Sequence, residues 1–163
     1  MKVLLSRIIV IGVVLALAAC EKKKQPEQAM PPVNELPAML LTQKDGSIVD
    51  AKNLEGKIVL IFFHPDCDHC QREAKEIEEH KDDFIGYKIY FISSDPMPQL
   101  VKFEEDYHLG NLPNVTFATT RVEFIMGNYG PIAAPSLFIY SAERRLVKKF
   151  IGETKIDQIT AAL

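Results

Sequence analysis

The chain has 163 residues, a length that suits one domain with a hydrophobic core. Its 19 lysines and arginines stand against 22 aspartates and glutamates, which gives a net charge of −3. Because this mildly acidic balance predicts no extended basic surface, we expect no nucleic-acid partner.

The N-terminal segment has the pattern of a secretory signal peptide. Lys2 and Arg7 precede an apolar run that is shorter than the ~20 residues needed to cross a bilayer. The run ends in Leu-Ala-Ala-Cys at 17–20, which resembles the bacterial lipobox, in which the cysteine becomes the lipidated first residue. We therefore expect residues 1–19 to be removed and Cys20 to carry the lipid. The remaining 144 residues would hold 17 basic and 22 acidic side chains, a net charge of −5.

The segment that follows, residues 20–35, is polar and contains Pro26, Pro31 and Pro32. This composition is typical of an extended tether, and we expect it to hold a folded domain, residues 36–163, off the membrane. A lipid anchor of this kind predicts a protein of the cell envelope that faces the periplasm. In that compartment no cytosolic glutathione pool keeps cysteines reduced.

The rest of the chain alternates between β-rich and helical patterns. Short apolar runs at 38–42 and 47–49 flank Lys44-Asp45-Gly46, and an Asp-Gly pair in this setting predicts a β-hairpin. We expect further strands at 58–63, 87–92, 115–118, 137–140 and 146–151, and helices at 71–84, 96–108, 121–128 and 155–163. This alternation predicts βαβ units with a parallel sheet, and the last two strands predict an antiparallel hairpin.

Two cysteines, Cys67 and Cys70, follow directly after the apolar run 58–63. At the junction of a buried strand and a helix, Cys67 would lie where free backbone N–H groups and the helix dipole favour an anion. The thiolate is the reactive form of cysteine, so we expect Cys67 to be a nucleophile and Cys70 to resolve its mixed disulfides. A zinc pair or an inert disulfide is the alternative, but a four-ligand zinc site would need partners, and the sequence has no second cysteine pair.

Charged neighbours bear on this pair in opposite ways. His69 can stabilise a Cys67 thiolate, whereas the negative charges of Asp66 and Asp68 raise a thiol pKa, so the direction of electron flow stays open. Glu73 lies one helical turn beyond Cys70 and, if buried, could shuttle the proton of that thiol. In the alternative interpretation, His69 and Glu73 are solvated surface residues.

A resemblance to a known family emerges from five stretches taken together. They are Asp45-Gly46, residues 53–57 (Asn-Leu-Glu-Gly-Lys), Cys67-Asp68-His69-Cys70 with Glu73, Tyr129-Gly130, and Ala134-Pro135-Ser136. Residues 36–163 resemble the thioredoxin fold, and within it the TlpA/ResA-type membrane-anchored thiol–disulfide oxidoreductases of the AhpC/TSA–redoxin superfamily. The sequence departs from that family where aromatic residues usually lie four and one positions before the first cysteine, because Asp66 occupies the second of these positions.

The resemblance implies an α/β fold with a central mixed β-sheet flanked by helices and an N-terminal β-hairpin extension. It implies a redox-active Cys67–Cys70 disulfide, a catalytic role for Glu73 and His69, and no metal or other cofactor. Pro135 would be the cis-proline facing the cysteines, so that Ala134 and Pro135 bind an extended substrate. The implied partners of a monomeric protein are protein thiols or disulfides and a membrane electron donor. The implied role is reductive, as in keeping apocytochrome c reduced.

Two other functions share this fold. A peroxiredoxin-like peroxidase would place a threonine three residues before the reactive cysteine, where this chain has His64. A copper-delivery protein would use a CxxxC spacing and a distant histidine, although His64 with Cys67 and Cys70 could form a soft-metal site. A c-type haem motif is excluded because Gln71 stands where the histidine would be.

Overall fold

We analysed a computed structural model, which describes residues 35–163. The predicted signal peptide, the lipidation site Cys20 and nearly all of the predicted tether lie outside the described residues. Within residues 35–163, no helix has the length and apolar character required to span a bilayer.

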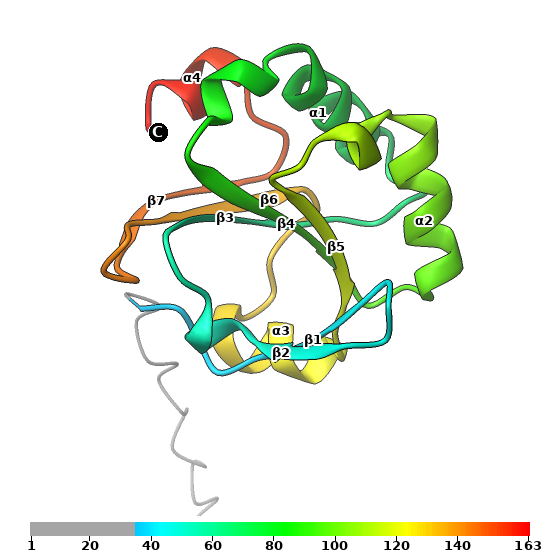
Figure 1. The fold of residues 1–163 in the computed structure, drawn as a ribbon, viewed down its shortest axis with the longest axis vertical. Coiled ribbons are helices and arrows are strands. Elements are labelled where there is room, and N and C mark those ends of the chain that lie inside the picture. The colour runs from blue at the N-terminus through cyan, green and yellow to red at the C-terminus, as the bar shows by residue number, and fades with distance from the viewer. Residues whose placement is uncertain (1–34) are drawn as a thin grey trace, which may run out of the picture.

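The domain is built on one mixed sheet of seven strands, in the order β2-β1-β5-β4-β3-β6-β7 (Figure 1). Strands β3, β4 and β5 run parallel, β6 is antiparallel to β3, and β7 is antiparallel to β6. The N-terminal hairpin extends the sheet because β1 pairs antiparallel with both β2 and β5. The strands are β1 Leu40–Gln43, β2 Ile48–Asp50, β3 Lys57–Phe62, β4 Tyr87–Ser93, β5 Val115–Thr119, β6 Ser136–Tyr140 and β7 Leu146–Ile151.

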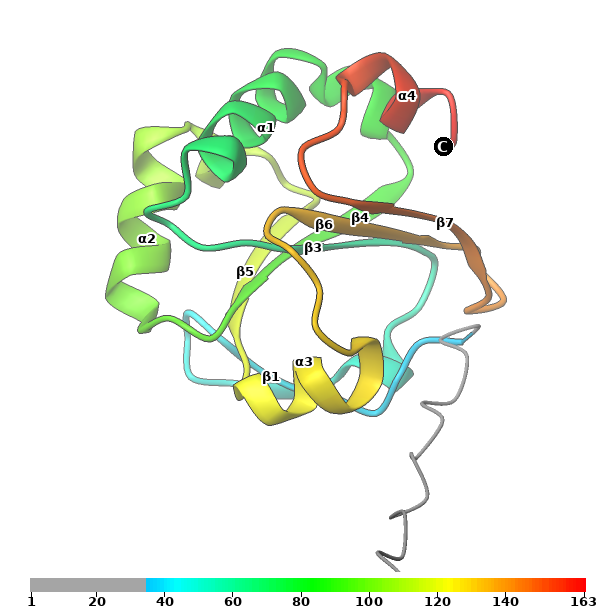
Figure 2. The same cartoon turned by 180° about the vertical axis from the view of Figure 1, so that it is seen from behind.

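Helices cover both faces of this sheet. Helices α1, α2 and α4 lie on one face, and α3 lies on the other with the β1–β2 hairpin (Figures 1 and 2). The α-helices are α1 Asp68–Glu79, α2 Met97–Asp106, α3 Val122–Tyr129 and α4 Ile156–Thr160, and the 3₁₀ turns are η1 Ala51–Asn53, η2 Lys81–Phe84 and η3 Leu109–Asn111. This arrangement confirms the predicted α/β fold with a helix-flanked mixed sheet and an N-terminal hairpin.

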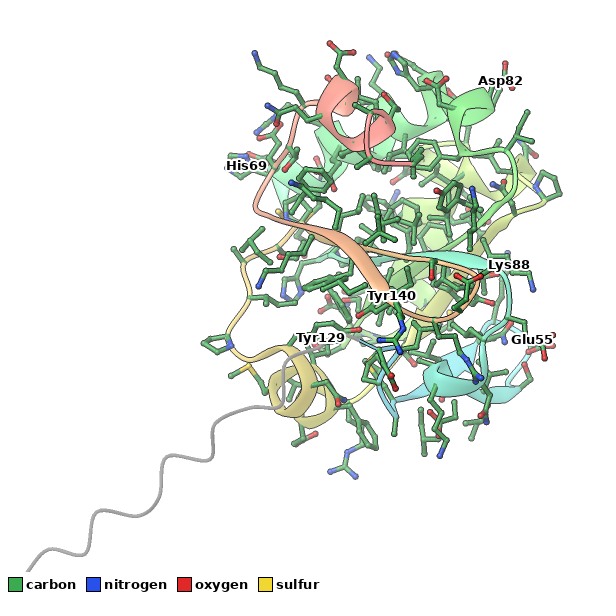
Figure 3. All side chains as sticks on the ribbon, turned by 90° about the vertical axis from the view of Figure 1, so that its left-hand side faces the viewer. Glu55, His69, Asp82, Lys88, Tyr129 and Tyr140 are labelled. Carbon is green, nitrogen blue, oxygen red and sulfur yellow. The ribbon has the colours of Figure 1, made fainter. Side chains whose placement is uncertain are left out.

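The central strand β3 shows why both faces of the sheet must be shielded from water. Successive side chains of a strand point to opposite faces, and here both sets are apolar. Val59 and Ile61 belong to the core under α1, α2 and α4, whereas Ile58, Leu60 and Phe62 belong to the core under α3 and the hairpin. On the second face, the hydroxyls of Tyr129 from α3 and Tyr140 from β6 meet at 3.1 Å (Figure 3).

Two predicted helices differ in extent from the observed ones. The helix expected at 71–84 begins earlier, at Asp68, because Cys67 caps it, and it ends at Glu79. The 3₁₀ turn η2 follows, since the chain must reverse within seven residues to enter β4, and Gly86 completes the reversal with φ 88°. The helix expected at 155–163 is shorter and spans Ile156–Thr160.

An aromatic cluster fills the core on the α1 face. The Phe91 ring stacks on Phe117 at a centroid distance of 4.9 Å and meets Phe63 edge-on at 5.5 Å. Phe103 from α2 packs against Phe63 at 4.7 Å. The cluster therefore ties β4, β5 and α2 to Phe63, the residue that opens the loop before Cys67.

We predict that Phe91→Ala lowers the free energy of unfolding by about 3–5 kcal/mol, because it leaves a cavity among these rings. Urea unfolding followed by circular dichroism measures this loss. The control is Ile85→Ala, since Ile85 is 77% exposed and its replacement should change stability by less than about 0.5 kcal/mol. A loss below about 1 kcal/mol for Phe91→Ala would contradict the central role of the cluster.

Candidate active site at the start of helix α1

Cys67 is the N-cap residue of α1. Its backbone is extended, with φ −90° and ψ 113°, and its Sγ accepts a hydrogen bond from the backbone N–H of Cys70 at 3.3 Å. A side-chain acceptor at this position satisfies one of the free N–H groups of the first helical turn. The helix dipole adds to this bond, so the position favours a negatively charged sulfur.

Cys70 lies behind Cys67 and is buried, with 2% of its surface exposed. Burial raises the pKa of the Cys70 thiol well above its ordinary value, and the hydrogen bond with Cys67 raises it further, against an opposing effect of the His64 backbone. Cys67 is only half-buried. The two thiols therefore differ in access. Both are free in this structure, so the predicted Cys67–Cys70 disulfide stays a prediction.

The loop before Cys67 is held by two hydrogen bonds. The backbone N–H of Cys67 donates to the carbonyl of His64 at 3.1 Å, which closes a turn. From the first turns of α1, the side-chain amide of Gln71 donates to the carbonyl of Pro65 at 2.9 Å. The position of Cys67 is therefore fixed on both sides, by the loop and by the helix.

Glu73 is buried on the inner face of α1, with 4% of its surface exposed. Its Oε2 accepts the backbone N–H of Thr154 at 3.1 Å, whereas its Oε1 has no hydrogen-bond partner among the described residues. Burial raises the pKa of Glu73 to about 7, and the negative charges of Glu153 and Glu76 add to this effect, while the Thr154 hydrogen bond opposes it. The structure thus gives Glu73 the burial on which the shuttle interpretation depends.

The Ala134–Pro135 peptide bond is cis, as the resemblance implied. It lies next to Cys67, whose Sγ is 3.7 Å from the carbonyl oxygen of Ala134. Pro135 is buried, and its own carbonyl accepts the backbone N–H of Gly152 at 2.8 Å, which ties it to the end of β7. The structure therefore brings the proposed substrate-binding residues and the cysteines together.

His69 lies on the surface and is paired with Glu153, which belongs to the segment after β7 (Figure 3). Its Nδ1 is within hydrogen-bonding distance of the Glu153 carboxylate and of the Arg72 guanidinium, 2.6 Å in the second case. One ring nitrogen serves only one of them at a time, donating to Glu153 when protonated and accepting from Arg72 when not. Arg72 itself binds Glu153 through two hydrogen bonds of 2.7 Å.

The Glu153 carboxylate carries a strongly lowered pKa as a result. The hydrogen bond from Arg72, followed by that from His69, lowers the pKa of Glu153 to about 2. Neither Arg72 nor Glu153 was predicted from the sequence. Arg72 lies one turn after His69 on the helix, but Glu153 comes from a distant segment and left no local signal.

The described residues contain no group of three or more His, Cys, Asp and Glu side chains arranged to hold a metal ion. The set considered for copper, His64 with Cys67 and Cys70, is not such a group. The Nδ1 of His64 is instead paired with the Asp95 carboxylate at 2.8 Å.

A sequence profile of the AhpC/TSA family matches residues 32–149, most of the chain. The chain belongs to the AhpC/TSA family. The predicted superfamily is thereby confirmed, and the relatives described next confirm the predicted enzyme class, that of the thioredoxin-like thiol–disulfide oxidoreductases.

Relatives of this AhpC/TSA protein include the thiol–disulfide oxidoreductase ResA of Bacillus thuringiensis (strain Al Hakam). It is 27% identical over 133 residues, which cover 79% of this chain and 75% of ResA. A ResA of Bacillus anthracis matches with the same identity and coverage.

Solved structures share the fold. StoA from Bacillus subtilis superposes with a TM-score of 0.56 at 21% identity, over 77% of this chain and 98% of StoA. A secreted disulfide oxidoreductase of Mycobacterium tuberculosis, homologous to E. coli DsbE, gives a TM-score of 0.61 at 18% identity, over 77% of this chain and 93% of that one.

We predict that stability falls with rising pH because of Glu73. The pKa of Glu73 is near 4.5 in the unfolded chain and about 7 in the folded protein. Between pH 4.5 and 7 the folded state therefore binds more protons than the unfolded state. The free energy of unfolding should therefore decrease from pH 4.5 to 7, by an amount of order 3 kcal/mol. From about pH 8 upward this group should add no further loss.

Urea unfolding of the reduced protein between pH 5 and 8 tests this prediction. Glu73→Gln stays neutral and should remove most of the decrease. The matched control is Glu79→Gln, an exposed carboxylate on the same helix, which should keep the wild-type slope. The same slope in Glu73→Gln and wild type would show that another group is responsible.

Proposed function

We propose that this protein reduces disulfides in proteins of the bacterial cell envelope, with Cys67 as the attacking nucleophile and Cys70 as the resolving thiol. One observation carries the proposal. The Cys67 sulfur caps α1, receives the backbone N–H of Cys70 at 3.3 Å, and lies 3.7 Å from the Ala134 carbonyl, beside the cis peptide bond. The reactive atom is thus stabilised on one side and faces a backbone surface for substrate on the other.

The chemistry has two exchange steps. The Cys67 thiolate attacks a substrate disulfide, forms a mixed disulfide and releases one substrate sulfur as a thiol. Cys70 then loses its proton and attacks the Cys67 sulfur, which releases the second substrate thiol and leaves a Cys67–Cys70 disulfide. The substrate gains two electrons and two protons. A dithiol of a membrane electron donor would return the enzyme to its reduced form.

Glu73 is the proposed base of the second step. Because burial raises the pKa of the Cys70 thiol, Cys70 needs a proton acceptor before it can attack. Glu73 lies one turn further on the same helix, and its pKa of about 7 allows it to take and return a proton near neutral pH. Its unpartnered Oε1 is free for that purpose.

The charges around His69 support the reductive direction. A thiol pair becomes a strong oxidant when its reduced form, with the thiolate, is stabilised by positive charge. In this protein, the Glu153 carboxylate binds the Arg72 guanidinium through two hydrogen bonds of 2.7 Å and offsets its positive charge. The Cys67 thiolate therefore receives less stabilisation from Arg72, which favours a reducing potential.

The proposed location and substrate are based on the N-terminal sequence and on the relatives. The lipobox-like segment ending at Cys20 supports a lipid anchor, and two relatives are ResA thiol–disulfide oxidoreductases. We propose a monomeric protein tethered at the envelope membrane, with apocytochrome c or another envelope protein as substrate. Mass spectrometry of the mature N-terminus would identify an acylated Cys20.

The roles of the two cysteines give the first test. Limiting iodoacetamide should label Cys67 before Cys70, because Cys70 is buried and its pKa is raised. Cys70→Ser should accumulate mixed disulfides with envelope proteins, visible on non-reducing gels, and Cys67→Ser should not. Wild type should reduce insulin, and both variants should fail. Equal labelling of the two thiols and equal trapping by the two variants would contradict the proposal.

The reduction potential gives the second test. Glu153→Gln leaves the positive charge of Arg72 without its carboxylate partner, so the thiolate form should become more stable and the potential less negative. We expect a change in the equilibrium constant with glutathione of about tenfold, which is about 30 mV for a two-electron couple. Adding Arg72→Gln to Glu153→Gln should reverse part of this shift, because it removes the charge that Glu153 had offset. Glu143→Gln, in the β6–β7 turn, is the control, and a shift as large in it as in Glu153→Gln would contradict the argument.

A further inference from the structure

A second pair of side chains lies at the same end of the sheet as the cysteines. Strands β3 and β4 are parallel, with Phe62 opposite Ile92, and the backbone N–H of Phe63 continues the ladder by donating to the Ile92 carbonyl at 3.1 Å. Both strands therefore end on the same side of the sheet, at their C-terminal ends. Each then places a polar residue two positions after its strand: His64 after β3 and Asp95 after β4.

The Asp95 carboxylate fixes the orientation of the His64 ring. Nδ1 of His64 lies 2.8 Å from Oδ2 of Asp95, which also accepts the hydroxyl of Ser93 at 2.7 Å. Partial burial acts to raise the pKa of Asp95, but the hydrogen bonds from His64 and Ser93 outweigh it and lower that pKa, so the carboxylate is ionised near neutral pH. Because a carboxylate only accepts, Nδ1 carries a proton, and Nε2 is the nitrogen left for other partners.

His64 lies in the turn that leads into Cys67. Its carbonyl closes the turn with the N–H of Cys67, and its side chain is 58% exposed. His64 and Ala134 line the same groove of about 220 Å³, and the Ala134 carbonyl is 3.7 Å from the Cys67 Sγ. The other residues that line this groove, among them Met126 and Ile132, do not ionise near neutral pH. A disulfide positioned for attack by Cys67 would thus meet one titratable side chain in the groove.

We propose that His64, oriented by Asp95, is the general acid that protonates the leaving sulfur of the substrate disulfide. The inference rests on the proposed function and adds a catalytic residue to it. As the Cys67 thiolate attacks, a Cys67–sulfur bond forms and the substrate S–S bond breaks. The electron pair of that bond goes to the departing sulfur, which takes the proton from Nε2 of His64. His64 is left neutral, with its proton on Nδ1, and regains the other from water.

The acidity of the leaving thiol provides a selective test. A sulfur that leaves as a weakly basic aryl thiolate needs no proton, whereas an alkyl thiolate is far more basic and gains from a general acid. Loss of a true general acid should therefore slow reaction with an alkyl disulfide and spare reaction with an aryl disulfide. A distorted Cys67 would react slowly with both.

The experiment compares rates of reduced wild type and variants with bis(hydroxyethyl) disulfide and with dithiodipyridine near neutral pH. His64→Asn should slow the alkyl reaction by about 10- to 100-fold and leave the aryl reaction within about twofold. Asp95→Asn should also lower the rate with the alkyl disulfide relative to the rate with the aryl disulfide, but by a smaller factor. The matched control is His108→Asn, because His108 is exposed and follows the far end of α2. It should react like wild type with both disulfides.

Equal slowing of both reactions in His64→Asn, or no slowing of either, would overturn the role of His64. The aryl reaction checks the proposed function separately, because it needs only Cys67 and Cys70. A wild-type protein that reacts with neither disulfide would overturn the proposed function and this inference with it. A wild type that reacts with both, with an unchanged alkyl-to-aryl ratio in His64→Asn, would overturn this inference alone.

Discussion

The hydrogen bond from the Cys70 backbone to the Cys67 sulfur is the contact on which the site depends. It starts helix α1 and holds the nucleophile in place, so that one atom serves both the structure and the chemistry. A charged sulfur accepts this bond more strongly than a neutral one. In the proposed reaction this sulfur enters a disulfide, which carries no charge, so the first turn of α1 would then lose part of its capping energy. The proposed function therefore implies that the start of the helix is coupled to the oxidation state of the site.

Two glutamates near this helix have very different pKa values because their environments differ. Glu73 is buried, only one of its two carboxylate oxygens has a hydrogen-bond partner among the described residues, and its pKa is about 7. Glu153 is bound by Arg72 and His69, and its pKa is about 2. They are also coupled, because the permanent charge of Glu153 helps to keep the Glu73 proton bound. Thr154 joins them physically, since it follows Glu153 in the chain and donates its backbone N–H to Glu73.

The sequence predicted most of the strands and helices, because β3 is apolar from Ile58 onward and helices α1 and α2 carry apolar faces. It also predicted that Cys67, Cys70 and Glu73 lie together at the start of one helix, whereas the cis bond before Pro135 followed from the family resemblance alone. The partners of the two histidines were missed for a physical reason. Asp95 meets His64 through the parallel register of β3 and β4, and Glu153 reaches His69 only after the chain turns beyond β7. Such contacts depend on tertiary structure and leave no spacing signal along the chain.

The two edges of the sheet have a consequence for how copies of this protein meet. An exposed strand edge can recruit a strand from another molecule, and proteins limit this with short or charged edge strands. Here β2 at one edge has three residues, and β7 at the other carries the exposed lysines Lys148 and Lys149. A second copy that paired its own β7 with this strand would bring lysines together. The sheet therefore resists the addition of strands from other copies at both of its edges.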